Sequence, residues 1–272
     1  MKRIVALIIS LTFLSPALTN AGKTGDEKVN LFFEANKLYN EDRYKEAVDI
    51  YLQLIESGYN NGHLYYNLGN ACFRLDQIGY VILYYERAKL LIPRDVDLDY
   101  NLRYVHQMTM DAVDENPGIL SMTFFWCDSM TVGEIFLIFA IINALFWIVL
   151  ILRLFFKQEW TYYLVVITLV TWLVSGCSFG WKYYQVNFIN RAVVLSNVVN
   201  VLSGPNSKDT ILFKLHAGTI VEQERVEDGW KLIKLPDKKR GWVNASMVEL
   251  INLKNMQNKK PIYDEISTII KK

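Results

Sequence analysis

The chain has 272 residues, of which 52% are hydrophobic, and its 29 basic and 28 acidic side chains leave a net charge of +1. This balance gives the protein no overall field that would favour nucleic acid or another anionic partner, and the hydrophobic content is high for a soluble chain. The three cysteines, Cys72, Cys127 and Cys177, form neither a CxxC pair nor a metal-ligand spacing. Cys72 lies in a helical pattern and Cys177 in an apolar stretch, so we expect both to be buried free thiols. We therefore expect no metal site, no other cofactor and no nucleic-acid partner.

The N-terminal 21 residues have the order of a secretory signal. Lys2 and Arg3 precede the apolar stretch 4–14, and the small residues 19–21 follow it. This order predicts a signal peptide over residues 1–21, cleaved after Ala21. An uncleaved anchor helix is the alternative, and in both cases the chain that follows is exported.

Residues 29–107 have apolar side chains at helical spacing, with breaks near 41–42, 58–62, 76–79 and Pro93. The breaks predict paired helices of about a dozen residues each. A shift of 34 residues aligns similar residues: Ala35 with Gly69, Ala47 with Val81, and Tyr51 with Tyr85. Small residues allow paired helices to approach closely, and the tyrosines fill the gap to the next repeat.

This segment resembles the tetratricopeptide repeat. The second unit has the signature residues Tyr65, Leu68, Gly69, Tyr85, Ala88 and Pro93. The first unit departs from the family at Leu54, where a small residue is usual. The resemblance implies an all-α tetratricopeptide repeat domain over residues 22–110, with about two repeats and a capping helix that begins near Asp95.

The same resemblance implies a peptide-binding inner face made by the first helix of each repeat. Its members are Phe32, Asn36, Tyr39, Asn40, His63, Tyr66, Asn67, Asn70, Phe73 and Arg74. Asn36 and Asn67 match the asparagines with which some members hold a terminal carboxylate, but Phe32, Asp97 and Asn101 replace the basic residues of that variant. Asparagine and tyrosine suit hydrogen bonding to a peptide backbone. The alternative, that these are solvated side chains without a ligand, stays open.

Two apolar spans follow a linker and interfacial segment at residues 111–132, in which Phe124–Trp126 suit the headgroup layer. Neither 135–152 nor 161–181 contains a charged residue, and each is about long enough to cross the ~30 Å hydrocarbon layer as a helix. We predict transmembrane helices at 133–155 and 160–181. The short connection makes them a hairpin, so both flanks lie in one compartment.

The charges around this hairpin predict its orientation. The turn carries Arg153 and Lys157, whereas the flank 111–132 carries four acidic residues and no Lys or Arg. Positive residues favour the cytoplasmic side, so we predict a cytoplasmic turn and exported flanks. Within the first span, Asn143 is predicted to hydrogen-bond the neighbouring helix or a partner helix.

From residue 190 to 251 the pattern changes to short β-branched runs separated by Gly, Pro and Asp, which predicts a small all-β barrel. The predicted strands are 192–195, 198–202, 219–226, 230–235 and 241–243. The strings 199–205, 216–219, 229–232 and 241–243 resemble the bacterial SH3-like domain. In that family Trp230 and Trp242 are core or barrel-edge residues. The tail 252–272 is basic, and it is either an amphipathic helix on the membrane surface or disordered.

The order of these segments resembles the Bacteroides aerotolerance operon family of BatE-like proteins. The resemblance implies a multidomain membrane protein in the bacterial inner membrane, with both soluble domains periplasmic. Its partners would be von Willebrand factor A-domain membrane proteins of the same operon, together with membrane lipid. We therefore expect a scaffold in an aerotolerance or stress-related complex. Binding of peptidoglycan by the SH3-like domain, or envelope sensing, is the alternative, and a conduit through the hairpin is the weakest hypothesis.

No catalytic residues can be assigned. The three histidines, His63, His106 and His216, have no nucleophile motif, phosphate-binding loop or paired carboxylates around them. The sequence therefore predicts that the protein is not an enzyme.

Overall fold

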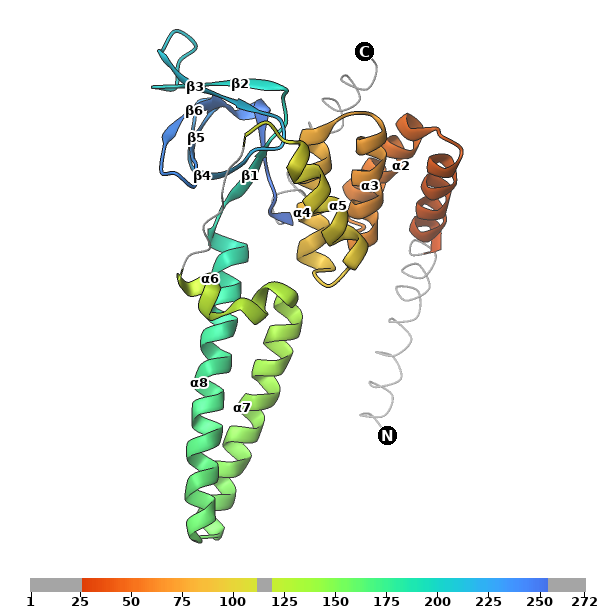
Figure 1. Cartoon of the computed structure of the whole chain (residues 1–272). Coiled ribbons are helices and arrows are strands. Elements are labelled where there is room, and N and C mark those ends of the chain that lie inside the picture. The colour runs from red at the N-terminus through yellow and green to blue at the C-terminus, as the bar shows by residue number, and fades with distance from the viewer. Residues whose placement is uncertain (1–25, 112–118, 254–272) are drawn as a thin grey trace, which may run out of the picture. The chain divides into compact units, whose positions relative to one another are not determined.

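The computed structural model describes residues 26–111 and 119–253 and divides them into two compact units (Figure 1). The first unit contains the described residues up to Gln77, and the second extends from Ile78 to the end of the described chain. The predicted signal peptide at 1–21 and nearly all of the tail at 252–272 lie outside the described residues.

The first unit consists of a helix over residues 26–40, followed by α2 (Tyr44–Glu56) and α3 (Gly62–Arg74). Turns with positive φ separate the helices at Asp42 (φ 61°) and Gly58 (φ 79°). Asn61 caps α3, because its side chain accepts a hydrogen bond from the backbone of His63. The small side chains Ala35 and Ala47 are fully buried, as expected where paired helices approach closely.

The second unit begins with α4 (Ile78–Leu91) and α5 (Val96–Met108). Asp95 caps α5 by accepting a hydrogen bond of 2.9 Å from the backbone N–H of Leu98. The starts of α2 and α4 are 34 residues apart, and so are the starts of α3 and α5. The predicted breaks lie at the ends of helices, although α3 begins at Gly62 and α4 at Ile78, inside two of them. The predicted helices are therefore confirmed, whereas the tetratricopeptide assignment stays a prediction.

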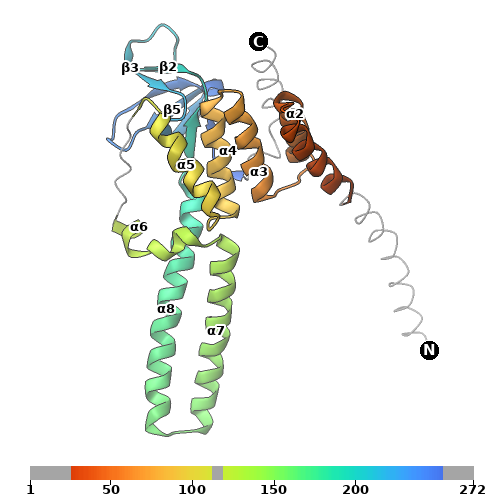
Figure 2. The same cartoon turned by 45° about the vertical axis from the view of Figure 1, so that its right-hand side comes forward.

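Two long helices, α7 (Val132–Phe155) and α8 (Glu159–Phe188), follow the short α6 (Ile119–Thr123) and the 3₁₀ turn η1 (Phe125–Ser129). Both are long and apolar enough to cross a membrane. They run side by side in opposite directions (Figure 2), joined by three residues, and α8 continues beyond the predicted end at residue 181.

One polar contact joins the middle of the two long helices. Trp172 Nε1 of α8 donates to Asn143 Oδ1 of α7 at 3.0 Å. The prediction that Asn143 hydrogen-bonds the neighbouring helix is therefore confirmed. At the turn, Arg153 donates to Thr161 Oγ1 at 3.2 Å and stacks over the Tyr162 ring.

The C-terminal sheet has seven antiparallel strands. They are β1 (Arg191–Val194), β2 (Val198–Leu202), β3 (Ile211–His216), β4 (Ile220–Glu227), β5 (Trp230–Lys234), β6 (Arg240–Asn244) and β7 (Val248–Leu250). Their order is β3-β2-β6-β5-β4-β1-β7, and the sheet curls around an apolar core (Figure 1). Two of these strands were not predicted from the sequence, β3 because its apolar run does not alternate cleanly and β7 because it is only three residues long.

The two tryptophans of the sheet lie where the resemblance implied. Trp242 is 6% exposed and packs under the guanidinium of Arg225, whose carbon lies 5.1 Å from the ring centroid. Trp230 is half-buried at the start of β5.

Candidate functional site

The residues predicted to bind peptide form one surface of the first unit, which we call the helical face. Helix 26–40 contributes Phe32, Asn36, Tyr39 and Asn40, and α3 contributes the others: His63, Tyr66, Asn67, Asn70, Phe73 and Arg74. Most of them are half-buried, whereas Asn40, His63 and Arg74 are exposed. The neighbours of a half-buried polar side chain restrict its conformation, and the side chain is still accessible to a ligand.

The two asparagines at the centre of the helical face are hydrogen-bonded to each other. Asn67 Nδ2 donates to Asn36 Oδ1 at 2.8 Å, and the Tyr51 hydroxyl of α2 donates to the same oxygen at 2.6 Å. Because two donors already occupy Asn36 Oδ1, the Asn36 amide N–H₂ and the Asn67 carbonyl are the groups that can serve a ligand. That combination matches the acceptor and donor of a peptide backbone.

Two aromatic groups flank this pair of amides. On one side, the Phe32 ring lies 6.3 Å from the rings of both Tyr51 and Tyr59. On the other, Tyr39 contacts Tyr44 edge-on at 5.3 Å, and the Arg74 guanidinium lies 5.9 Å from the Tyr44 ring centroid. The predicted residues Phe32, Tyr39 and Arg74 are thus held by partners from α2 and the turn after it.

The part that Tyr51 plays in the helical face was not predicted, because the sequence analysis assigned it only to packing between repeats. Burial raises the pKa of Tyr51 strongly, and its hydrogen bond with Asn67 lowers it by less. The hydroxyl therefore stays protonated and donates to Asn36. Tyr51 lies on the apolar, buried face of α2, and a buried tyrosine hydroxyl usually needs a hydrogen-bond partner. This position could have indicated such a partner from the sequence.

A second set of polar contacts lies within the second unit, where α4 and α5 pack against the C-terminal sheet; we call it the junction. Every residue of α4 from Gly79 to Ala88 is buried. A Cβ on Gly79 would lie 2.7 Å from the carbonyl oxygens of both Val194 and Leu195. Only glycine allows the helix to approach the end of β1 this closely.

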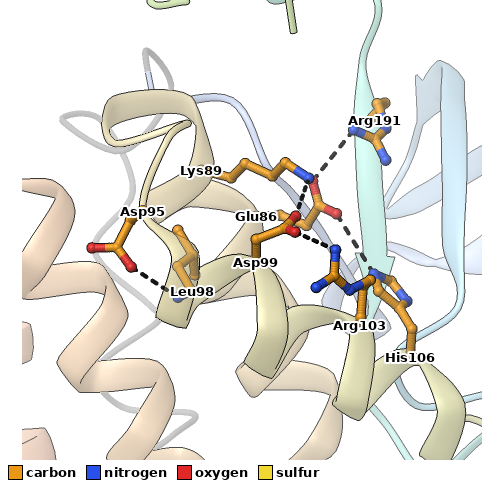
Figure 3. Close-up of polar contacts among 8 residues, drawn as sticks. All are labelled: Glu86, Lys89, Asp95, Leu98, Asp99, Arg103, His106 and Arg191. Carbon is orange, nitrogen blue, oxygen red and sulfur yellow. Dashed lines mark hydrogen bonds and ion pairs between the residues drawn. The ribbon is translucent and has the colours of Figure 1, made fainter. Parts of the chain in front are cut away.

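Glu86 of α4 is the acidic centre of the junction (Figure 3). Arg191 of β1 donates to Glu86 Oε2 at 3.3 Å, and His106 Nε2 of α5 lies 3.7 Å from Oε1. Burial raises the pKa of Glu86, but Arg191, His106 and Lys89 together lower it more, to about 2. Glu86 is therefore a charged group held in the interior by cations from both sides of the junction.

Figure 3 also shows how the two helices of the junction are tied to each other. Asp99 of α5 lies between Lys89 of α4, at 3.4 Å, and Arg103, one turn further along α5. These groups are partly exposed, so we assign them a minor share of the stability.

Arg87, next to Glu86, is fully buried. Its Nη2 donates to the backbone oxygen of Leu250 at 2.6 Å and lies 3.4 Å from Glu249 Oε1, both in β7. Its guanidinium carbon lies 5.7 Å from the Tyr84 ring centroid. Arg87 thus binds β7, the strand that pairs with β1 at the edge of the described sheet.

Asp111, just beyond α5, forms the third polar contact of the junction. Its Oδ2 accepts hydrogen bonds from the His216 backbone at 2.7 Å and from Thr219 Oγ1 at 2.6 Å, and its Oδ1 lies 2.8 Å from His216 Nδ1. Burial raises the pKa of Asp111, but the hydrogen bonds from Thr219 and His216 lower it more. The carboxylate therefore fastens the end of α5 to the turn between β3 and β4.

The sequence analysis did not predict the junction. The residues that join the helical segment to the sheet are separated by about a hundred residues or more, so no local spacing relates them. One signal was available, because α4 is apolar on all sides apart from Glu86, Arg87 and Lys89. A helix with that pattern is covered on every face.

Among residues 26–111 and 119–253, no group of three or more His, Cys, Asp or Glu side chains is arranged to hold a metal ion. Cys72 is buried, as the sequence analysis expected of a structural thiol, and burial raises its pKa. Cys177, which was also expected to be buried, is exposed on the surface of α8.

Comparison with known proteins identifies one segment. Residues 196–249, which include β2 to β6, match the bacterial SH3 domain family. No curated protein matches the chain. The segment 196–249 of the C-terminal sheet is therefore similar to a bacterial SH3 domain, a module that suggests interaction with proteins or the cell wall.

Proposed function

We propose that the protein is a non-enzymatic scaffold of the bacterial inner membrane that presents a repeat-helix module and an SH3 domain to the periplasm. The junction is the observation that carries this proposal. It binds α4 and α5, which precede the two apolar helices, to the sheet that follows them. A chain whose flanks bind each other keeps both flanks in one compartment.

The 34-residue spacing of helix starts supports a tetratricopeptide origin for the helices. The left-handed residues Asp42 and Asp76 repeat with the same period. The amides of the helical face support an extended peptide as its ligand. Following the resemblance to BatE-like proteins, we propose an exported segment of a von Willebrand factor A-domain membrane protein, within an aerotolerance or stress complex.

A photocrosslinking experiment tests the scaffold. A benzophenone amino acid replaces Tyr66 on the helical face, and the matched control replaces Gln53, which is exposed on α2 outside this face. We expect one dominant protein adduct from position 66 and none from position 53. Equal recovery from both positions, or none above background, would contradict a specific peptide-binding face.

Cysteine labelling tests the topology, in a Cys177→Ala background that removes the exposed native thiol. We expect an impermeant maleimide, added from the periplasmic side, to label Asn200→Cys and not Lys157→Cys. The basic turn supports this orientation. Labelling at position 157 would reverse the proposed topology.

A second function, binding of peptidoglycan, is favoured by the match to the bacterial SH3 domain. The full-length protein in detergent is sedimented with purified wall material. Leu212→Lys changes an exposed residue of β3, away from the junction. Sedimentation that depends on Leu212 would favour wall binding, and no sedimentation would leave the scaffold as the better proposal.

A further inference from the structure

The segment before α7 exposes several large apolar side chains. Ile119 is 82% exposed, Met122 62% and Phe125 69%, and Leu120 is also exposed. No charged residue lies between Ile119 and Cys127. Exposed side chains of this kind in adjoining turns form a patch that needs an apolar neighbour.

The other side of this segment is bound to α8. Lys182 Nζ donates to the backbone oxygen of Cys127 at 2.7 Å, and Trp126 Nε1 donates to Ser178 Oγ at 3.2 Å. The Cys127 thiol lies 3.7 Å from the Ser178 carbonyl oxygen. Figures 1 and 2 both show α6 beside the upper part of α8. The contacts fix the level of η1 along α8.

Charged residues at the ends of the apolar runs indicate where η1 lies relative to a bilayer. On α8, residues 160–181 are uncharged, which is about 33 Å of helix at a rise of ~1.5 Å per residue. On α7, residues 135–152 are uncharged, which is about 27 Å. Both lengths are close to the ~30 Å hydrocarbon layer. Glu134 and Lys182 therefore mark one boundary, and η1 is bound to Lys182.

We infer that α6 and η1 form a lipid-binding collar, whose exposed apolar side chains enter the leaflet on the side of the soluble flanks. The inference rests on the proposed membrane hairpin. We assign lipid as the neighbour of this patch because the patch lies beside the apolar surfaces of α7 and α8, at the end of the uncharged part of both helices. Phe124 and Trp126, which pack edge-on at 5.6 Å, are the aromatic types typical of this interface.

The collar also determines the height of the junction above the membrane. Arg94, in the turn between α4 and α5, forms an ion pair with Glu134 at the start of α7. Glu134 is itself fixed by a capping box with Thr131. The junction is thus tied to the same boundary at which the collar enters lipid.

A fluorescence experiment tests the collar in the full-length protein reconstituted into lipid nanodiscs. An environment-sensitive label is placed at Met122→Cys, Val170→Cys or Tyr100→Cys in a Cys177→Ala background. Val170 is exposed in the middle of α8, and Tyr100 is exposed on α5. Nitroxide lipids that carry the quencher near the headgroup or deep in the chains are compared.

We expect the headgroup-level quencher to act on position 122 at least about twofold more than on position 100, as for a segment lying in the interface. We expect the deep quencher to act on position 170. If position 170 is quenched and position 122 behaves like position 100, the collar is wrong and the hairpin stands. If position 170 is not quenched, the hairpin itself fails. Protection of position 122 from both lipid and water would mean that a protein covers the patch, which also overturns the collar.

Discussion

α2 and α4 occupy equivalent places in the 34-residue pattern, yet their outer faces have different surroundings. Lys45 and Gln53 of α2 are exposed. The residues 34 positions later, Gly79 and Arg87 of α4, are buried against the C-terminal sheet. The period therefore determines where the helices begin and end, but not what covers them.

The polar groups of the two regions differ in the same way. On the helical face, amides and tyrosines are half-buried and open to a ligand, whereas Glu86 and Arg87 of the junction are buried. Polar groups buried in this way are costly to leave unpaired. We expect changes at the junction to affect mainly stability, and changes at the helical face to affect mainly binding.

The largest effect should come from Arg87→Ala. It removes the contacts of Arg87 Nη2 with Glu249 Oε1 and with the Leu250 carbonyl, and removing one partner of a buried pair costs about 3–5 kcal/mol. The matched control is Gln53→Ala on α2, for which we expect less than about 0.5 kcal/mol. Thermal unfolding of the detergent-solubilised protein measures both. Similar melting temperatures for the two variants would contradict the inference that α4 contributes more to stability through its buried contacts than the exposed face of α2 does.

Acid should weaken the junction through Glu86. Its folded pKa of about 2 lies below the ordinary value of 4.5, so its stabilisation is present above pH 4.5 and is lost as the pH falls toward 2. The difference corresponds to about 3 kcal/mol of folding stability. The lowered pKa of Asp111 acts in the same direction.

Glu86→Gln should therefore reduce the fall in melting temperature between pH 5 and pH 3, relative to the wild-type protein. Asp97→Asn, which removes an exposed carboxylate of α5, is the control and should leave the pH profile unchanged. An unchanged profile in Glu86→Gln would mean that the Arg191 and His106 contacts do not stabilise the carboxylate.

Gly79→Ala should have an intermediate effect. The added methyl group would overlap the carbonyl oxygens of Val194 and Leu195, and overpacking of this kind costs about 1–3 kcal/mol. Gly133→Ala, where no atom lies within 4 Å of the new Cβ, should be neutral or slightly stabilising. Limited proteolysis measures how readily the sheet separates from α4. Equal protection in both variants would contradict the close approach.

The sequence was sufficient for features that depend on local pattern. The helix boundaries could be predicted from turn residues such as Asp42, and the two long apolar helices from two uncharged runs. Most strands could be predicted from β-branched segments. The contact of Asn143 with the neighbouring helix followed from its isolation in an apolar span. Whether the helical face binds a peptide stays a prediction.

The junction could not be derived in this way, because it depends on distant segments brought together by the fold. Asp111 was assigned to a linker, yet it accepts hydrogen bonds from residues more than a hundred positions later. Glu86 and Arg191 are likewise in contact although both apolar helices lie between them in the sequence. Only the apolar character of α4 on every face gave a local sign that something covers it.

The smallest change in stability should come from Asn36→Ala on the helical face. It removes the acceptor shared by Tyr51 and Asn67, and a lost hydrogen bond of this kind costs about 1 kcal/mol. Asn40→Ala, four residues later on the same helix and exposed, should cost less than about 0.5 kcal/mol. Crosslinking from position 66 gives the sharper readout, because Asn36→Ala should abolish the adduct while the protein stays folded. If the adduct persists, binding of the ligand does not depend on the central amides. The helical face would then be a solvated surface that differs from the junction only in its exposure.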